Sequence, residues 1–276
     1  MSEVLVGLSA LADDAFRLAA APLFDEGDVD ALEWSFDTAD PPDWLAGLLD
    51  FCSAEGRLWG HGVSYSPLSA GFSAHQARWL ERLADETSRR TYQGFSEHFG
   101  VSRAQGWRQA PPLPVPWTPT SEAVGIDRMQ RFSEAAGVPV GLENLALAFG
   151  MRDVLDQGAF LDALLEPVDG YLHLDLHNLW CQCVNFDVAP GTLLSRYPLD
   201  RVRVVHVAGG SWSMAGGSPF RRDTHDGPVP QEVLDLLRLT LQICSGLQVV
   251  FLERLRPDPA ALRADLRAVR EVVDDT

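Results

Sequence analysis

Histidine and carboxylate side chains gather at the carboxyl ends of the predicted strands, where their types and spacing suit metal chemistry. Of the seven histidines, only His75 falls on a predicted helix. In a low-dielectric pocket clustered carboxylates repel one another, and bound cations remove that conflict. Mixed imidazole and carboxylate ligands suit iron, zinc or manganese. The candidate metal ligands are His61, Glu97, His98, Glu143, Asn144, Asp175, His177, Asn178, His206, Asp223, His225 and Glu253.

Each of these residues also has an ordinary structural alternative. A single histidine at a strand end is more often a hydrogen-bonded core or loop residue, and a lone aspartate after a strand is more often a helix cap. Residues 223–226 could form a polar turn, and His173 and His177 suit packing as well as ligation. Glu97 and His98 are alternatives for one ligand position. Six of the eight predicted strand ends nevertheless present Glu, Asp or His, and this joint pattern favours a metal site.

The elements that must position these residues alternate between strand and helix. Strands are predicted at residues 4–9, 31–36, 57–63, 91–97, 138–143, 171–175, 202–207 and 247–253. Amphipathic helices are predicted at 74–90, 120–137, 231–245 and 260–274, with Ser73 as an N-cap and Pro230 and Pro259 near helix starts. An eightfold strand–helix alternation predicts an α/β fold, a single (β/α)8 TIM barrel. Its strand ends would converge on one opening.

Two connections are longer than the usual few residues and leave from the carboxyl ends of strands. They cover residues 100–119 and 209–228. Long loops on this face of a barrel are typically lids or binding loops. Candidate substrate-binding residues in these connections are Trp107, Trp117, Trp212, Arg221 and Arg222, and Ser64 after the third predicted strand is a further candidate. Ordinary packing of the tryptophans over the barrel mouth is the alternative.

The composition fits one globular domain over residues 1–276 and excludes several classes of function. Hydrophobic residues make up 46% and charged residues 22% of the chain, which is ordinary for a folded domain. A formal net charge of −17 repels phosphate backbones, which argues against nucleic acid as a partner. No apolar run reaches the ~20 residues needed to cross a bilayer, and the N-terminus lacks a signal-peptide pattern. We therefore expect a cytoplasmic protein without a membrane partner.

Cysteine and lysine usage narrow the chemistry further. The four cysteines are expected to be free thiols, and Cys181 and Cys183 lack the spacing of a zinc knuckle or a thioredoxin motif. All 22 basic residues are arginines. The absence of lysine from the sequence disfavours any mechanism with a lysine base or a Schiff base.

At the strand ends the sequence resembles the multinuclear non-haem iron-dependent oxidative enzymes, the family that includes methanobactin biosynthesis protein B. The resemblance covers nearly the whole chain in the right order and spacing. It is carried by His61-Gly62-Val63-Ser64, Ser96-Glu97-His98, Leu142-Glu143-Asn144, Leu174-Asp175-Leu176-His177-Asn178, His206-Val207-Ala208-Gly209, Asp223-Thr224-His225-Asp226 and Leu252-Glu253.

The resemblance implies a metal barrel similar to endonuclease IV and xylose isomerase. It implies two or three irons, in mixed Fe(II) and Fe(III) states, that use O2 to oxidise cysteines of a ribosomally made precursor peptide. The cysteine would bind as thiolate, and an Fe(III)-superoxo species would abstract hydrogen from its β-carbon. Because the chain ends soon after the eighth helix, we expect a small separate protein to help recognise the peptide.

The resemblance also sorts the ligands into three groups. A central iron would use Glu143, Asp175, His206 and Glu253. A second would use His61 and either Glu97 or His98, and would share Glu143. A third would use Asn178, Asp223 and His225. Asn144 would be a ligand or an orienting group within the centre. Where many relatives read Asp-Val-Asn-Asn, this chain reads Asp175-Leu176-His177-Asn178. This departure leaves open the number of irons, the product and whether Cys181 or Cys183 reaches the site.

Two other classes of function remain as alternatives. A phosphodiesterase of the endonuclease IV type is disfavoured because Arg221 and Arg222 are the only local basic pair near the strand ends. A sugar isomerase usually needs a lysine in the pocket, and this chain has none. A non-enzymatic, metal-dependent peptide-binding protein is also compatible with the sequence. Turnover of O2 with a cysteine peptide would separate an enzyme from a binding protein.

Overall fold

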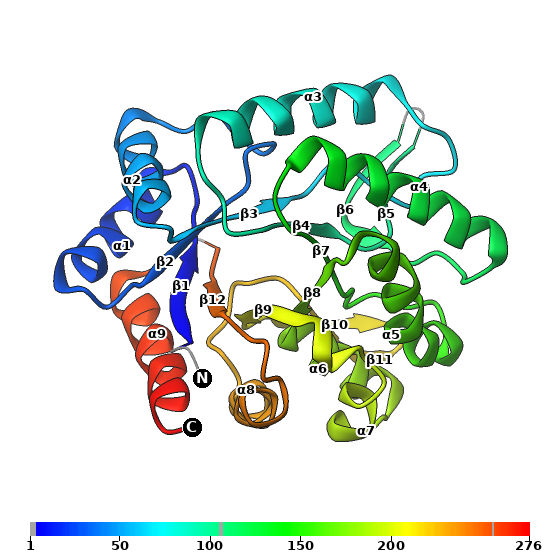
Figure 1. The fold of residues 1–276 in the computed structure, drawn as a ribbon. Helices are drawn as coiled ribbons and strands as arrows, with labels where there is room; N and C mark the ends of the chain where they lie inside the picture. Colours follow the sequence, from blue (N-terminus) through cyan, green and yellow to red (C-terminus); the bar gives the residue numbers. More distant parts are fainter. Residues whose placement is uncertain (1–3, 105–106, 256) are drawn as a thin grey trace.

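Eight parallel strands form a closed barrel at the centre of the molecule (Figure 1). The computed structural model describes residues 4–104, 107–255 and 257–276. The barrel strands are β1 (Leu5–Ser9), β2 (Ala31–Trp34), β3 (Leu58–Gly62), β4 (Phe95–His98), β7 (Val140–Glu143), β8 (Tyr171–Asp175), β9 (Val202–Ala208) and β12 (Val249–Glu253). They follow one another around the barrel in chain order, and β1 pairs with both β2 and β12 to close it. The predicted TIM-barrel fold is therefore confirmed.

Helices surround the barrel on its outside (Figure 1). They are α1 (Asp14–Glu26), α2 (Asp43–Ala54), α3 (Ala74–Arg89), α4 (Pro119–Ala136), α5 (Met151–Leu165), α6 (Leu176–Phe186), α7 (Pro190–Leu194), α8 (Gln231–Ile243) and α9 (Pro259–Asp274). Two short 3-10 turns, Glu166–Val168 and Leu199–Arg201, precede β8 and β9. Of the described helices, none is long and apolar enough to cross a membrane.

Local sequence signals set the helix ends close to where they were predicted. The Ser73 hydroxyl accepts the backbone N–H of Gln76, whose side chain accepts the N–H of Ser73, so a capping box opens α3. Helix α4 begins one residue before the predicted Thr120, because Thr118 caps it and Pro119 occupies its first turn. Gly137 ends α4 with a φ of 62°, a conformation that glycine adopts without strain.

Strand β4 is shorter than predicted at its start. Residues 91–94 have strand-like composition, yet they connect α3 to the barrel. Tyr92 is buried there, and its hydroxyl donates to the Glu86 carboxylate at 2.6 Å. The segment just before Phe95 still bonds to β3, because the Gln93 N–H donates to the Leu58 carbonyl and the Gly60 N–H donates to the Gly94 carbonyl.

The two long connections after β4 and β9 each contain an antiparallel hairpin. The first is β5 (Val101–Ala104) with β6 (Trp107–Leu113), and the second is β10 (Ser211–Ala215) with β11 (Ser218–Arg222). Gly216 and Gly217 turn the second hairpin with φ values of 59° and 87°. Two positive φ values are typical of a type I′ hairpin turn. The sequence analysis predicted loops here, and the structure corrects them to hairpins.

A layer of large side chains fills the amino-terminal half of the barrel. Trp59 on β3 and Tyr171 on β8 meet across the barrel with ring centroids 6.2 Å apart. Val204, Val249 and Phe251 belong to the same buried cluster. Because this layer closes the amino-terminal end, the polar residues at the carboxyl ends of the strands lie above an apolar floor.

Candidate metal centre

Three groups of metal-ligating side chains lie side by side at the carboxyl end of the barrel. Within each group, one potential ligand atom per residue lies within 4.8 Å of the others. The groups are His61, His98 and Glu143; Glu143, Asp175, His206 and Glu253; and Asp175, Asp223 and His225. Glu143 joins the first group to the second, and Asp175 joins the second to the third. The three positions are therefore adjacent.

Six neighbouring barrel strands supply most of these residues. Strands β3, β4, β7, β8, β9 and β12 are consecutive in the barrel, and each carries at least one ligand candidate at or near its carboxyl end. The register pairs His98 with Glu143, and Asp175 with His206. Asp223 and His225 come from the segment after β11, so the second hairpin returns the chain to the mouth.

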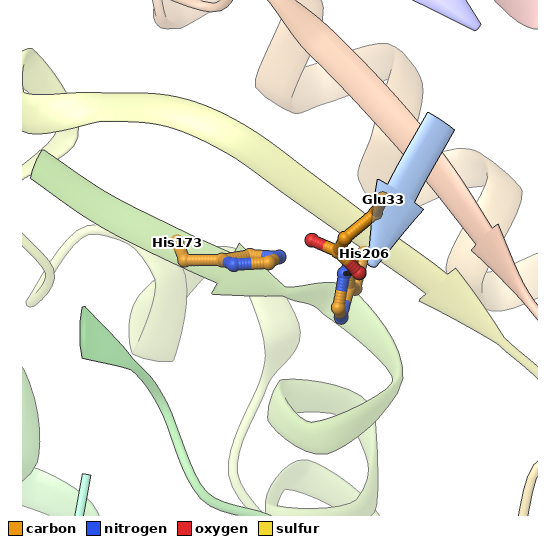
Figure 2. A group of neighbouring side chains, drawn as sticks. All are labelled: Glu33, His173 and His206. Carbon is orange, nitrogen blue, oxygen red and sulfur yellow. Dashed lines mark hydrogen bonds and ion pairs between the residues drawn. The ribbon is translucent and has the colours of Figure 1, made fainter. Parts of the chain in front are cut away.

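Glu33 contacts this centre and was missed by the sequence analysis. Its Oε2 lies 2.8 Å from His206 Nε2 and also accepts the Ser9 hydroxyl at 2.8 Å. Figure 2 shows His173 pointing toward the pair that Glu33 and His206 form. With Nε2 occupied, His206 directs Nδ1 at Glu253 Oε2, 3.1 Å away. Glu33, His173 and His206 form a fourth buried group, below the other three.

Ser96 and a backbone carbonyl orient the two histidines of the first group. The Ser96 hydroxyl lies 2.9 Å from His61 Nδ1 and 2.8 Å from His173 Nδ1. His98 Nδ1 lies 3.1 Å from the Gly62 carbonyl, which can only accept, so Nδ1 carries the proton. The Nε2 atoms of His61 and His98 then face Glu143 Oε2, at 3.3 and 3.2 Å.

The structure places His98 in the first group and the Glu97 carboxylate outside the groups of described residues. Glu97 accepts the backbone N–H groups of Tyr65 and His98, each at 2.9 Å. Burial raises the pKa of Glu97, while His98 opposes that shift. Of the two predicted alternatives for one ligand position, His98 is the one that faces Glu143.

Asn144 holds the backbone of Asp175 in place. Its amide donates to the Asp175 carbonyl at 2.9 Å and accepts the Asp175 N–H at 2.7 Å. The Asp175 carboxylate caps α6 by accepting the Asn178 N–H at 2.6 Å. Asn178 in turn donates to the Asn144 carbonyl. Of its two predicted roles, ligand or orienting group, these contacts support the orienting one for Asn144.

His177 orients Asp223 and, among the described residues, belongs to none of the groups. Its Nε2 lies 3.3 Å from the Arg221 guanidinium, which can only donate, so Nε2 accepts. Nδ1 therefore carries the proton and donates to Asp223 Oδ1 at 2.6 Å. Asp223 Oδ2 remains 2.7 Å from His225 Nε2. Cys181 Sγ lies 3.9 Å from His177 Nδ1, while Cys183 packs in the hydrophobic core.

Burial and neighbouring charges shift the pKa values of the clustered side chains, often in opposite directions. Burial alone would lower the pKa of His98, but the Glu143 and Glu97 carboxylates raise it to about 10. Burial would raise the pKa of Glu143, but His98 and His206 hold it well below its usual range. The pKa of Asp175 is raised well above normal by burial and by the neighbouring Asp223. Positive charge at the three groups would relieve this repulsion between carboxylates.

Buried atoms without hydrogen-bond partners point to cations. Among the described residues, four such atoms belong to candidate ligands. They are Glu143 Oε2, Asp175 Oδ2, Asn178 Oδ1 and His206 Nδ1. A buried polar atom without a partner is costly, and a metal ion would supply the missing interaction. Imidazole, carboxylate and amide oxygen donors together fit a metal ion such as iron, zinc or manganese.

The candidate substrate-binding residues are spread around the mouth. Trp117 stacks on Phe160 at 5.6 Å between ring centroids, which is ordinary packing. Trp107 is half-buried at the start of β6. Trp212 on β10 is 54% exposed.

Of the polar candidates, only Arg222 is open to solvent. Arg221 is buried against the Trp180 ring, with the guanidinium carbon 4.8 Å from its centroid. Arg222 donates to the Ser213 hydroxyl. Ser64 donates to Asp37 at 2.6 Å. Their roles in substrate binding stay predictions.

Comparisons with known proteins agree with this architecture. The chain is 31% identical over 238 residues to a UPF0276 protein of Streptomyces avermitilis; the match covers 79% of this chain and 47% of that protein. The chain thus spans about half of the length of that relative. Among solved structures, endonuclease IV from Thermus thermophilus superposes with a TM-score of 0.62 at 17% identity, over 99% of this chain and 100% of that one.

A xylose isomerase-like TIM barrel protein from Mycobacterium smegmatis, in complex with magnesium, superposes with a TM-score of 0.56 at 14% identity, over 100% of this chain and 99% of that one. At such identities these two likenesses show the fold alone. The sequence model described as "RiPP precursor modification enzyme MbnB/TglH/ChrH" matches residues 37–274. A match over this much of the barrel, ligand-bearing strand ends included, shows that the chain belongs to the MbnB/TglH/ChrH family of RiPP precursor modification enzymes.

Proposed function

We propose that this protein uses iron and O2 to oxidise cysteine residues in a ribosomally made precursor peptide. The observation that carries the proposal is the sharing of Glu143 and Asp175 between adjacent groups. Two shared carboxylates leave room for two or three ions within reach of one substrate side chain. Family membership supports peptide modification as the overall task.

The donor chemistry favours iron within this proposal. The three groups combine imidazole nitrogens with carboxylate oxygens, a mixture typical of non-haem iron. When bound, the iron ions would activate O2 and hold the substrate sulfur as a thiolate. The four cysteines of the chain are free and buried, which keeps them from competing with a substrate thiol.

The residues of the chain would orient and hold the ligands. Glu33 and Ser96 set which nitrogen of His206 and of His61 faces the ions. His177 directs Asp223 toward His225. Such supporting contacts fix the tautomer and the orientation of a ligand, and their loss typically costs 10- to 100-fold in metal affinity or activity.

A small recognition protein for the peptide is part of the proposal. The barrel carries two hairpins at its mouth, and neither forms a separate peptide-binding domain in the described residues. A purified chain that modifies its whole peptide alone, at the rate seen in cells, would remove the partner from the proposal.

The test of function starts with metal content. Anaerobically purified protein would be analysed by inductively coupled plasma mass spectrometry and, after iron-57 loading, by Mössbauer spectroscopy. Two or three irons per chain, with an O2-dependent mass change in a cysteine-containing peptide from a neighbouring gene, is the expected result. Zinc alone with no O2 consumption would exclude the oxidative reaction and favour a hydrolytic or binding role.

A further inference from the structure

A cavity of about 750 Å³ lies between the loop that follows β3 and the first hairpin. Tyr65, Ser66 and Phe72 line one wall, and Arg103 on β5 lines the other. Tyr65 follows His61 by four residues, and Arg103 follows His98 by five. Extended chain advances at most ~3.6 Å per residue, so both walls lie within about 18 Å of a ligand candidate. A peptide in this cavity would reach the centre within a few residues.

Hydroxyl groups bind the two walls of the cavity to each other. The Ser66 hydroxyl accepts the backbone N–H groups of Ser102 and Arg103, at 2.9 and 3.1 Å. The Ser69 hydroxyl donates to the Arg103 carbonyl at 2.6 Å. Ser66 adopts a left-handed φ of 59°, which serine rarely does without such contacts. The backbone of Arg103 is therefore fixed to the opposite wall.

The guanidinium of Arg103 has no hydrogen-bond or ion-pair partner among the described residues, and its Nε is buried. The chain has 39 acidic residues and a net charge of −17, yet none of the described carboxylates pairs with it. The positive charge at this cavity is reinforced on the Phe72 side. The Arg128 and Arg131 guanidinium carbons lie 5.0 and 4.7 Å from the Phe72 ring centroid.

Among the described residues, Asp127 forms the ion pairs of the two arginines beside Phe72, and Glu134 also lies near Arg131. With Arg103 this leaves a surplus of positive charge at the cavity of an otherwise acidic protein. The rest of the lining is mixed: Ala70 and Ala74 are small and apolar, while Ser73, His75 and Gln76 are polar. A ligand that matches these features carries a carboxylate next to apolar groups.

We propose that this cavity binds an acidic segment of the substrate peptide, with Arg103 pairing with a carboxylate about four or five residues from the cysteine that is modified. Phe72 would pack against an apolar residue of the same segment. The choice of a peptide as the occupant rests on the proposed function. The carboxylate specificity rests on Arg103 and the cavity alone.

The experiment measures binding without turnover. Two short fluorescein-labelled peptides, amidated at the C-terminus, carry serine in place of cysteine and either Asp or Asn about four residues away. Fluorescence anisotropy with the full chain should show the Asp peptide binding roughly tenfold more tightly than the Asn peptide. A third peptide, with Asn and a free terminal carboxylate, tells a side-chain source of the carboxylate from a chain end. Equal binding of the Asp and Asn peptides, with no gain from the free terminus, would overturn the proposal, as would no binding of any of the three.

Substitutions of Arg103 and of a control arginine test whether Arg103 causes the preference for a carboxylate. R103Q should abolish the preference for a carboxylate, and R103K should keep part of it because the charge remains. R152Q is the control, because Arg152 on α5 is 87% exposed and pairs only with Asp156 among the described residues. Thermal melts check that each variant folds. A preference that persists in R103Q would place the carboxylate elsewhere and refute the assignment.

The binding results can distinguish a failure of this inference from a failure of the proposed function. The binding assay uses serine peptides and needs neither iron nor O2. A protein that distinguishes Asp from Asn through Arg103 but oxidises no cysteine would retain the cavity assignment and lose the oxidative reaction. A protein that oxidises cysteine peptides without regard to nearby charge would do the reverse.

Discussion

Glu33 Oε2 lies 2.8 Å from His206 Nε2, so a carboxylate on β2 orients a ligand candidate on β9. The two residues are 173 positions apart in the sequence, and the barrel brings them together at full burial. Because Nε2–H donates to Glu33, the lone pair of Nδ1 is left for a metal ion. Such a carboxylate–histidine contact also raises the basicity of the ligating nitrogen. Glu33 thereby influences the centre without belonging to its three upper groups.

Replacing Glu33 should weaken metal binding. We expect E33A to lower the affinity of the chain for Fe(II) by about 10- to 100-fold, since His206 would lose the acceptor that fixes its tautomer. E33Q should lose much less, because the amide oxygen can still accept Nε2–H. Anaerobic competition with a chelator measures both. E55A at the exposed Glu55 is the control. If E33A binds iron as tightly as the unmodified chain, Glu33 has no orienting role.

The sequence could predict ligand candidates that end their strands but not Glu33. Strand β2 was predicted to run to residue 36, which put Glu33 in its interior, whereas the strand ends at Trp34. Strand ends depend on pairing with neighbours, which local composition does not encode. The sequence also could not decide whether Glu97 or His98 is the ligand candidate. Successive strand residues face opposite sides, and only the register that pairs His98 with Glu143 settles which one faces the centre.

Contacts between segments that are distant in the chain could not be predicted from the sequence either. His177 was named as a ligand candidate from its place after Asp175, yet Arg221 and Asp223 occupy both of its nitrogens. Arg221 reaches it only because the second hairpin folds back over α6. By contrast, two helix starts are marked locally: Ser73 is the N-cap of α3, and Pro259 is the first residue of α9.

Replacing a ligand that two groups share should remove more ions than replacing a ligand that belongs to one group. Glu143 belongs to two groups, whereas His225 belongs to one. In a chain that binds three irons, E143A should lose two ions and H225A one, as counted by plasma mass spectrometry after anaerobic loading. E143Q preserves the side-chain volume and tests whether the charge is needed. Equal losses from E143A and H225A would show that Glu143 does not bridge adjacent positions.

Metal binding should release protons at neutral pH. The carboxylates around His206 and His225 outweigh the effect of burial and raise the pKa of both imidazoles well above the normal value, and they raise the pKa of His98 to about 10. These histidines therefore hold protons at pH 7 when no metal is bound, and a metal needs them neutral. Apparent affinity should rise as the pH increases from about 6 to about 8, by up to tenfold per pH unit for each proton released. Calorimetry in two buffers of different ionisation enthalpy counts the protons; a heat that is the same in both would contradict the prediction.

The buried thiols should resist alkylation until the chain unfolds. Burial raises the pKa of Cys183 to about 12 and that of Cys52 and Cys244 to about 11, so the reactive thiolate is scarce at pH 8. Iodoacetamide should label the native protein slowly at pH 8 and label all four cysteines in guanidinium chloride, as measured by intact mass. Raising the pH toward these pKa values should speed labelling only as far as the fold admits the reagent. Rapid labelling of Cys181 alone in the native protein would instead show that the thiol beside His177 is open to the barrel mouth and available to the metal centre.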